Sequence, residues 1–180
     1  MYLNKRSYVK NWDHYQPEDR YSITIRKGGK PIAPYEIDPQ KITYLIQEVG
    51  YWRKANAIHR WFVENVQDDQ DDCKEYWINR EKLRELLDIV DKVLAASELV
   101  TGKIRNGTMY ENGKAMAVIE DGQNIKDPSL AKELLPTQGG FFFGSTDYNQ
   151  WYYDDLLNTK RILEDALADP YGEYYYQSSW

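Results

Sequence analysis

The chain has 180 residues, of which 42% are apolar and 29% charged, and 29 acidic residues against 23 basic ones give a formal net charge of −6. This composition can bury a core in a single domain over 1–180 and argues against wholesale disorder. The acidic balance also argues against a dedicated binder of duplex nucleic acid, because such proteins are normally basic.

Residues 1–37 are predicted to form an N-terminal strand and hairpin region. Residues 1–19 are polar and aromatic and show no clear period. The stretch 21–26 (YSITIR) alternates between apolar and polar residues, which is typical of a strand. Gly28 and Gly29 then supply a turn, and 30–33 can return as a short partner strand.

Residues 38–96 are predicted to be helical. Asp38 followed by proline is a typical helix start. From Ile42 to Val66 apolar residues recur every three or four positions, which predicts one long helix that Gly50 bends or splits. After an acidic turn over 67–73, Asn79 is predicted to cap a second helix over 80–96.

Residues 100–119 are predicted to be an inserted β-meander, because Asn-Gly pairs at 106–107 and 112–113 are hairpin-turn signals. Asp127 and Pro128 predict a short helix that ends near Leu135. Within the helical segment 128–168, Ser145 or Thr146 is predicted to cap a last long helix over 147–168. The aromatic tail, 169–180, is expected to lie on a surface or against a neighbouring chain.

These elements together predict an α+β fold that is mainly helical. Three to four packed helices would carry a small antiparallel β element and the inserted β-meander. No apolar run approaches the roughly 18–20 residues that span a bilayer, and the first residues do not resemble a signal peptide. One cysteine and two histidines argue against a disulfide framework and against metal chemistry. We therefore expect a cytoplasmic protein with no membrane partner and no cofactor.

The predicted long helix carries the first candidate ligand-binding residues. Its apolar stripe passes through Asn56 and His59, so both polar side chains are predicted to face inward. An unpaired buried amide or imidazole costs on the order of 1–3 kcal/mol, so each needs a ligand or a neighbouring side chain as partner. Trp52 adds a ring beside them, and Arg53, Lys54 and Arg60 add positive charge.

A glycine-rich loop, TQGGFFFGSTDY over 137–148, carries the second set. Glycines let the backbone approach a ligand closely, and a helix beginning at 145–147 would offer free N–H groups to a phosphate or carboxylate. The alternative is that the phenylalanines fix the loop in the core while Ser145 and Thr146 only cap. We expect the loop to meet the middle of the long helix. The candidate residues are Gln138, Gly139, Gly140, Gly144, Ser145, Thr146, Asp147 and Tyr148.

Other polar groups give weaker signals. The acidic turn QDDQDDC lacks the spacing and the glycine of a calcium loop, so it is predicted to be a solvated turn. Cys73 lies in an acidic segment with no base near it in the sequence, which disfavours a nucleophile. An enzyme could pair His59 with Asp147 as acid and base. No catalytic residue is assigned.

Two long motifs resemble a widespread family of small phage and prophage proteins. They are GYWRKANAIHRWFVENVQDDQDDC and LLPTQGGFFFGSTDYNQWYYDDL. The resemblance covers about 48–94 and 128–167, and the inserted segment is similar to one in longer members. It implies a bacteriophage protein that acts in the cytoplasm of an infected bacterial host, and it brings no catalytic residues.

Three functions follow as hypotheses. The favoured one is a non-enzymatic protein that binds and sequesters a small nucleotide-like molecule, as a counter-defence sponge, with its many tyrosines and tryptophans stacking on the ligand. The second is an inhibitor of a host defence or nucleic-acid-processing protein, which the acidic turn and the aromatic tail would contact. The third is a nucleotide-acting hydrolase or transferase. A homo-oligomer is compatible with each of them.

Overall fold

The computed structural model describes residues 1–33, 36–111, 113–140 and 144–179. Within these ranges the chain is an α+β fold with 34% helix and 31% strand, arranged as four helices and three antiparallel sheets. The prediction of a mainly helical fold is therefore wrong. The main sheet has the strand order β4-β1-β8-β5. Its strands are β1 (Tyr2–Tyr8), β4 (Tyr44–Tyr51), β5 (Glu75–Ile78) and β8 (Glu173–Gln177).

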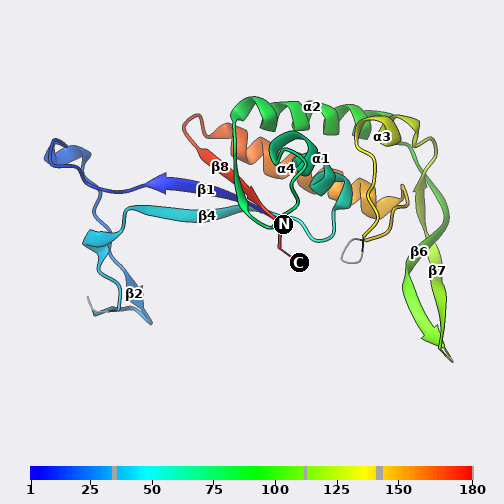
Figure 1. Cartoon of the computed structure of the whole chain (residues 1–180), viewed down its shortest axis with the longest axis horizontal. Coiled ribbons are helices and arrows are strands. Elements are labelled where there is room, and N and C mark those ends of the chain that lie inside the picture. The colour runs from blue at the N-terminus through cyan, green and yellow to red at the C-terminus, as the bar shows by residue number, and fades with distance from the viewer. Residues whose placement is uncertain (34–35, 112, 141–143, 180) are drawn as a thin grey trace.

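The first and last strands of the chain, β1 and β8, are the two central strands of this sheet (Figure 1). β1 pairs with β4 on one side and with β8 on the other, so the aromatic tail is an interior strand. Tyr174 and Tyr176 are buried in the core, whereas Tyr175 lies on the opposite face under the guanidinium of Arg6. The tail does not lie on a surface as predicted, because alternate tyrosines bury large apolar area beneath the helices.

The predicted long helix is split into a strand and a shorter helix. Tyr44–Tyr51 forms β4, an edge strand, and α1 begins only at Asn56 and ends at Val66. At Gly50 the strand runs so close to α4 that an added Cβ would lie 2.4 Å from Cγ2 of Ile162. A short apolar run fits a helix or a strand equally well, and pairing with β1 decides for the strand.

The remaining helices follow the predictions more closely. α2 spans Arg80–Ala96, and Oδ1 of its N-cap, Asn79, accepts a hydrogen bond from Lys82 N, as predicted. α3 spans Ser129–Leu134. α4 spans Gln150–Ala168 and begins three residues later than predicted, because Asn149 is its N-cap.

Two hairpins extend from this body (Figure 1). The small one joins β2 (Arg26–Lys27) and β3 (Lys30–Pro31), so the predicted strand over 21–26 is much shorter. The large one joins β6 (Leu99–Glu111) to β7 (Lys114–Ile125) as a single long ribbon rather than a meander.

The Asn-Gly pair at 106–107 makes a bulge in β6 instead of a turn, where the register shifts between Arg105 and Thr108. Gly107 there has a φ of 97°, in the left-handed region that favours glycine. Of the second pair, Asn112 lies outside the described residues.

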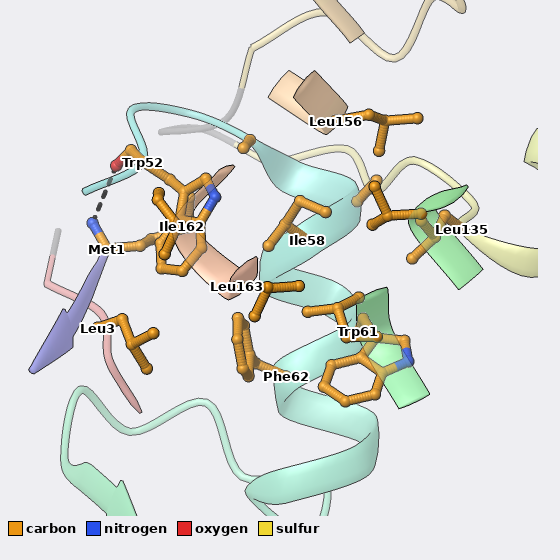
Figure 2. Packing of buried hydrophobic residues seen from close by; sticks show 14 of the residues in the cluster. Met1, Leu3, Trp52, Ile58, Trp61, Phe62, Leu135, Leu156, Ile162 and Leu163 are labelled. Atoms are coloured by element: carbon orange, nitrogen blue, oxygen red, sulfur yellow. Dashed lines mark hydrogen bonds between the residues drawn. The ribbon is translucent and has the colours of Figure 1, made fainter. Parts of the chain in front are cut away.

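One apolar core lies between the main sheet and helices α1, α2 and α4 (Figure 2). Leu3, Phe62 and Leu163 are fully buried there. The terminal amine of Met1 donates to the carbonyl of Trp52 at 3.2 Å, which ties the start of β1 to the turn before α1. This turn carries the residues of the candidate site.

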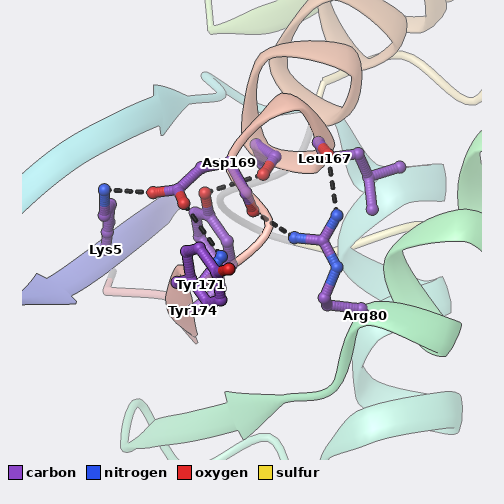
Figure 3. Close-up of polar contacts among 7 residues, drawn as sticks. Lys5, Arg80, Leu167, Asp169, Tyr171 and Tyr174 are labelled. Carbon is purple, nitrogen blue, oxygen red and sulfur yellow. Dashed lines mark hydrogen bonds and ion pairs between the residues drawn. The ribbon is translucent and has the colours of Figure 1, made fainter.

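The end of α4 is fixed by side chains from two other elements (Figure 3). Arg80, at the start of α2, donates to the carbonyls of Leu167 and Asp169. Lys5 of β1 makes an ion pair with the Asp169 carboxylate. A guanidinium satisfies the last carbonyls of a helix and complements its dipole. These contacts set the direction of α4, which forms one wall of the site.

Candidate ligand-binding cleft

Asn56 joins the first turn of α1 to the glycine-rich loop. Its Nδ2 donates to the carbonyl of Ser145 at 2.9 Å, and its Oδ1 accepts from the backbone N–H of Gln138 at 3.1 Å. The side chain is 5% exposed, so it faces inward as predicted. The loop and the start of α1 therefore meet, and Asn56 holds both ends of the glycine-rich segment.

His59 is also buried, but its hydrogen bonds run away from the loop. Nδ1 lies 2.7 Å from the hydroxyl of Tyr176, and Nε2 lies 3.1 Å from Oδ2 of Asp71. Burial lowers the pKa of His59, against the opposing effect of Asp71. In the neutral ring, Nε2–H donates to Asp71 and Nδ1 accepts from Tyr176. Residues 68–71 of the acidic turn are exposed, as predicted for a solvated turn, although Asp71 contacts His59. His59 is hydrogen-bonded to Tyr176 and Asp71, and not to Asp147 as suggested.

A cleft of about 660 Å³ opens beside Asn56. Its walls are the turn before α1 and the first turn of that helix, the end of the glycine-rich loop, the first two turns of α4 and the bulge of β6. The predicted site residues that line it are Arg53, Asn56, Gly144, Ser145 and Asp147.

The other predicted residues lie outside this cleft. Trp52 is in the core, where its Nε1 donates to Oγ1 of Thr159 at 2.8 Å. Arg60 pairs with Glu64 on the surface of α1. The hydroxyl of Tyr148 accepts from the backbone N–H of Thr137. The remaining predicted residues outside the cleft are His59, Gln138, Gly139, Gly140 and Thr146.

The predicted anion site at a helix N-terminus over 145–147 is not present. Oδ1 of Asn149 accepts from the N–H of Trp151 at 2.9 Å and caps α4. Ser145 instead donates to Oδ2 of Asp147 at 2.6 Å and accepts from its N–H. The segment before Asn149 is therefore a separate turn. The phenylalanines that were the alternative explanation of this loop, 141–143, lie outside the described residues.

The cleft has two more basic residues: Lys54, which the sequence places near this face, and Arg105, which the sequence analysis missed. Lys54 occupies the left-handed region with a φ of 63°, in the turn that directs it and Arg53 toward the cleft. Arg105 comes from the β6 bulge and donates to neutral partners, the carbonyl of Gly107 and the hydroxyl of Thr108. Arg53, Lys54 and Arg105 are all exposed, and in the described part of the chain none of them is paired with a carboxylate.

The α4 wall combines an aromatic ring with carboxyl groups. Trp151 is 46% exposed at the mouth of the cleft. Asp154 and Asp155 follow on the same helix, and burial, together with the charge of Asp154, raises the pKa of Asp155 to about 7. Near neutral pH a part of the Asp155 population is therefore uncharged, which reduces the negative charge that an anionic ligand would meet.

Among the described residues no three His, Cys, Asp or Glu side chains are placed to hold a metal ion. Nor does any helix described there have the length and apolarity needed to cross a membrane. No protein-family model matches the chain, and no curated protein or solved structure matches it either. The chemistry of the cleft has to be judged from its own residues.

Proposed function

We propose that this protein binds a small, anionic, nucleotide-like molecule in the cleft and holds it without converting it. The observation that carries the proposal is the meeting of Arg53, Lys54 and Arg105 around one cleft, without carboxylate partners in the described residues, although the chain as a whole is acidic. Surface cations are usually scattered or paired. Three that converge on one concave surface favour an anion.

The chemistry of the walls suits a nucleotide. Guanidinium groups bind phosphate oxygens through two parallel N–H bonds, and an ammonium group adds a compact charge. The half-exposed indole of Trp151 offers a flat face on which a base can stack. The volume of about 660 Å³ lies within the range of about 300–1,000 Å³ that is typical of small-molecule sites.

Binding is favoured over catalysis by the position of the candidate bases. His59 is fully buried outside the cleft, and Asp147 is hydrogen-bonded to Ser145. The features that suggested an inhibitor of a host protein are used inside the fold only in part. Asp71 contacts His59 and Tyr176 lies in the core, whereas Asp68, Asp69 and Tyr171 are exposed. Sequestration of a bacterial signalling nucleotide belongs to the same proposal, and the phage origin that the resemblance implies is compatible with such a counter-defence role.

Calorimetric titration with mononucleotides, cyclic nucleotides and ADP-ribose tests this function. We expect one site, and at least a tenfold loss of affinity in Arg53→Glu. The matched control is Arg84→Glu, which makes the same charge change at an exposed position of α2 outside the cleft. The bound ligand should be recovered intact after denaturation.

The proposal would be overturned if the folded protein bound none of these nucleotides at concentrations of tens of micromolar. It would also be overturned if Arg84→Glu lost as much nucleotide affinity as Arg53→Glu. Chemically altered ligand would replace it with the enzyme hypothesis.

A further inference from the structure

The cleft is the middle one of three adjoining clefts. It shares Arg53 and Asp155 with a second cleft of about 530 Å³ between β4 and α4. It shares Arg105 and Asp147 with a third cleft of about 570 Å³ between the β6–β7 hairpin and the loop before α4. Because the same side chains border neighbouring clefts, the three clefts adjoin one another, and together they are called the groove.

Further basic residues extend the charge of the central cleft in both directions. Arg161 lies at the β4 end, whereas Lys103 and Lys132 lie at the hairpin end, and all three are exposed. Among the described residues the groove has six basic and four acidic side chains, in a chain with 23 basic and 29 acidic residues. Basic residues are thus concentrated along this surface. The acidic ones are Glu48, Asp147, Asp154 and Asp155.

Two of these cations have carboxylate partners, but both pairs are weak. Arg161 lies 3.5 Å from Asp165, and Lys103 lies 2.7 Å from Asp121, with all four side chains at least 64% exposed. Exposed pairs of this kind contribute about 0–1 kcal/mol. A phosphate chain in the groove can therefore replace the carboxylates.

Each part of the groove also has an aromatic side chain. Tyr51 is 47% exposed in the β4 part, and Trp151 is 46% exposed in the central part. Tyr148 lines the hairpin part, where the ammonium of Lys132 lies 5.7 Å from its ring centroid. From Asn149 to Arg161 the helix rises by roughly 18 Å, so the rings and cations alternate over the length of several nucleotides.

We propose that this groove binds single-stranded nucleic acid. The inference rests on the proposed function, because the nucleotide site becomes the central subsite of the groove. A cationic track with aromatic rings is how proteins bind single strands without reading their sequence, and stacking on each ring contributes about 1–3 kcal/mol per base. A duplex hides the faces of its bases, so Tyr51 and Trp151 could not stack on them.

Fluorescence anisotropy on the full chain tests the groove, using labelled oligo(dT) and oligo(rU) of increasing length from one nucleotide upward. We expect affinity to rise at least tenfold with length and then level off when the groove is filled. The logarithm of the binding constant should fall with the logarithm of salt concentration, with a slope of about 0.7 per neutralised phosphate. A blunt hairpin duplex of equal charge should bind at least tenfold more weakly.

Variants at the two ends of the groove separate this inference from the proposed function. Arg161→Glu and Lys132→Glu should each weaken oligonucleotide binding several-fold, and together at least tenfold, with less than a twofold change for a mononucleotide. Arg84→Glu is again the control and should affect neither. Circular dichroism verifies that each variant is folded.

Mononucleotide binding without any gain from length would overturn the groove and leave the proposed function standing. Failure of both ligands to bind would overturn both proposals. Binding of the duplex as tightly as the single strand, or oligonucleotide binding that the end variants leave unchanged, would also overturn the groove. The comparison of oligo(dT) with oligo(rU) shows which nucleic acid it prefers.

Discussion

The amide nitrogen of Asn56 donates to the carbonyl of Ser145 at 2.9 Å, across 89 positions of the chain. Since Oδ1 of Asn56 also accepts from the backbone of Gln138, one buried side chain fixes both ends of the glycine-rich loop to α1. The wall of the cleft therefore depends on a residue that contributes little exposed surface itself.

Asn56→Leu is predicted to lower the free energy of unfolding by about 1–3 kcal/mol, because a backbone N–H and a carbonyl lose their buried partner. The affinity for a nucleotide should also fall, because Ser145, which lines the cleft, is no longer held by Asn56. Urea unfolding measures the first effect and calorimetric titration the second. Asn158→Leu is the control, since Asn158 also donates to a carbonyl, that of Tyr51, but at an exposed site. An Asn56→Leu protein as stable as the wild type would contradict the assigned role.

Stability should decrease as the pH falls below about 6.5, and His59 should account for part of the decrease. Burial lowers the pKa of His59 below its ordinary value of 6.5. The unfolded chain therefore binds a proton in a range where the folded chain does not, so the free energy of unfolding falls with pH. Thermal unfolding from pH 5 to pH 8 measures this.

The second histidine of the chain, His14, is exposed and gives the control. His14→Gln should leave the pH dependence of the unfolding temperature unchanged, whereas His59→Gln should make it less steep. If His59→Gln does not fold, titration of the wild-type imidazole by NMR decides, and a value above 6.5 for His59 would refute the prediction.

Asp155 should produce the opposite pH dependence. Its pKa of about 7, against an ordinary 3.8, means that the folded chain keeps a proton that the unfolded chain has lost between these pH values. Stability therefore falls as the pH rises through this window. Asp155→Asn should match the wild type near pH 4 and be more stable than it at pH 8, whereas Asp88→Asn, at an exposed position of α2, should show no such change.

Nucleotide binding gives a second readout for Asp155. Affinity for an anion should decrease as the pH rises through 7 and Asp155 becomes charged, and Asp155→Asn should remove that decrease. Identical pH profiles for the wild type and the variant would rule out a role for this carboxyl group in the cleft.

Gly50→Ala is predicted to destabilise the fold by about 1–3 kcal/mol. The added Cβ would lie 2.4 Å from Cγ2 of Ile162, so β4 or α4 would have to move. Gly139→Ala is the control, because among the described residues the nearest heavy atom outside its neighbours, Cγ2 of Thr146, would lie at 3.9 Å, which is ordinary contact. Chemical denaturation of both variants tests the packing of β4 on α4, and equal stabilities would show that this packing is looser than described.

The amino-acid sequence alone determined the elements that depend on local signals. Asn79 caps α2 and the apolar period of that helix continues to Ala96. Asp38 and Asp127 accept hydrogen bonds from the N–H groups of Gln40 and Ser129, as their positions before prolines indicate. Asp38, however, begins only a 3₁₀ helix over Pro39–Lys41 and not the predicted long helix. The inward direction of Asn56 and His59 also followed from the sequence, because α1 keeps the helical period from Asn56 onward.

Tertiary structure alone decided which segments became strands and which cations met. Tyr2–Tyr8 and Glu173–Gln177 have no strong local preference, and they are strands because each pairs with the other in the sheet. Lys54 and Arg105 are far apart in sequence, and only the bulge of β6 and the turn before α1 bring them to one cleft. A helix cap is formed by residues that are neighbours in sequence, so the local sequence predicts it. A sheet or a cleft is formed by segments that are far apart in sequence, and nothing in either segment alone shows that the two will meet.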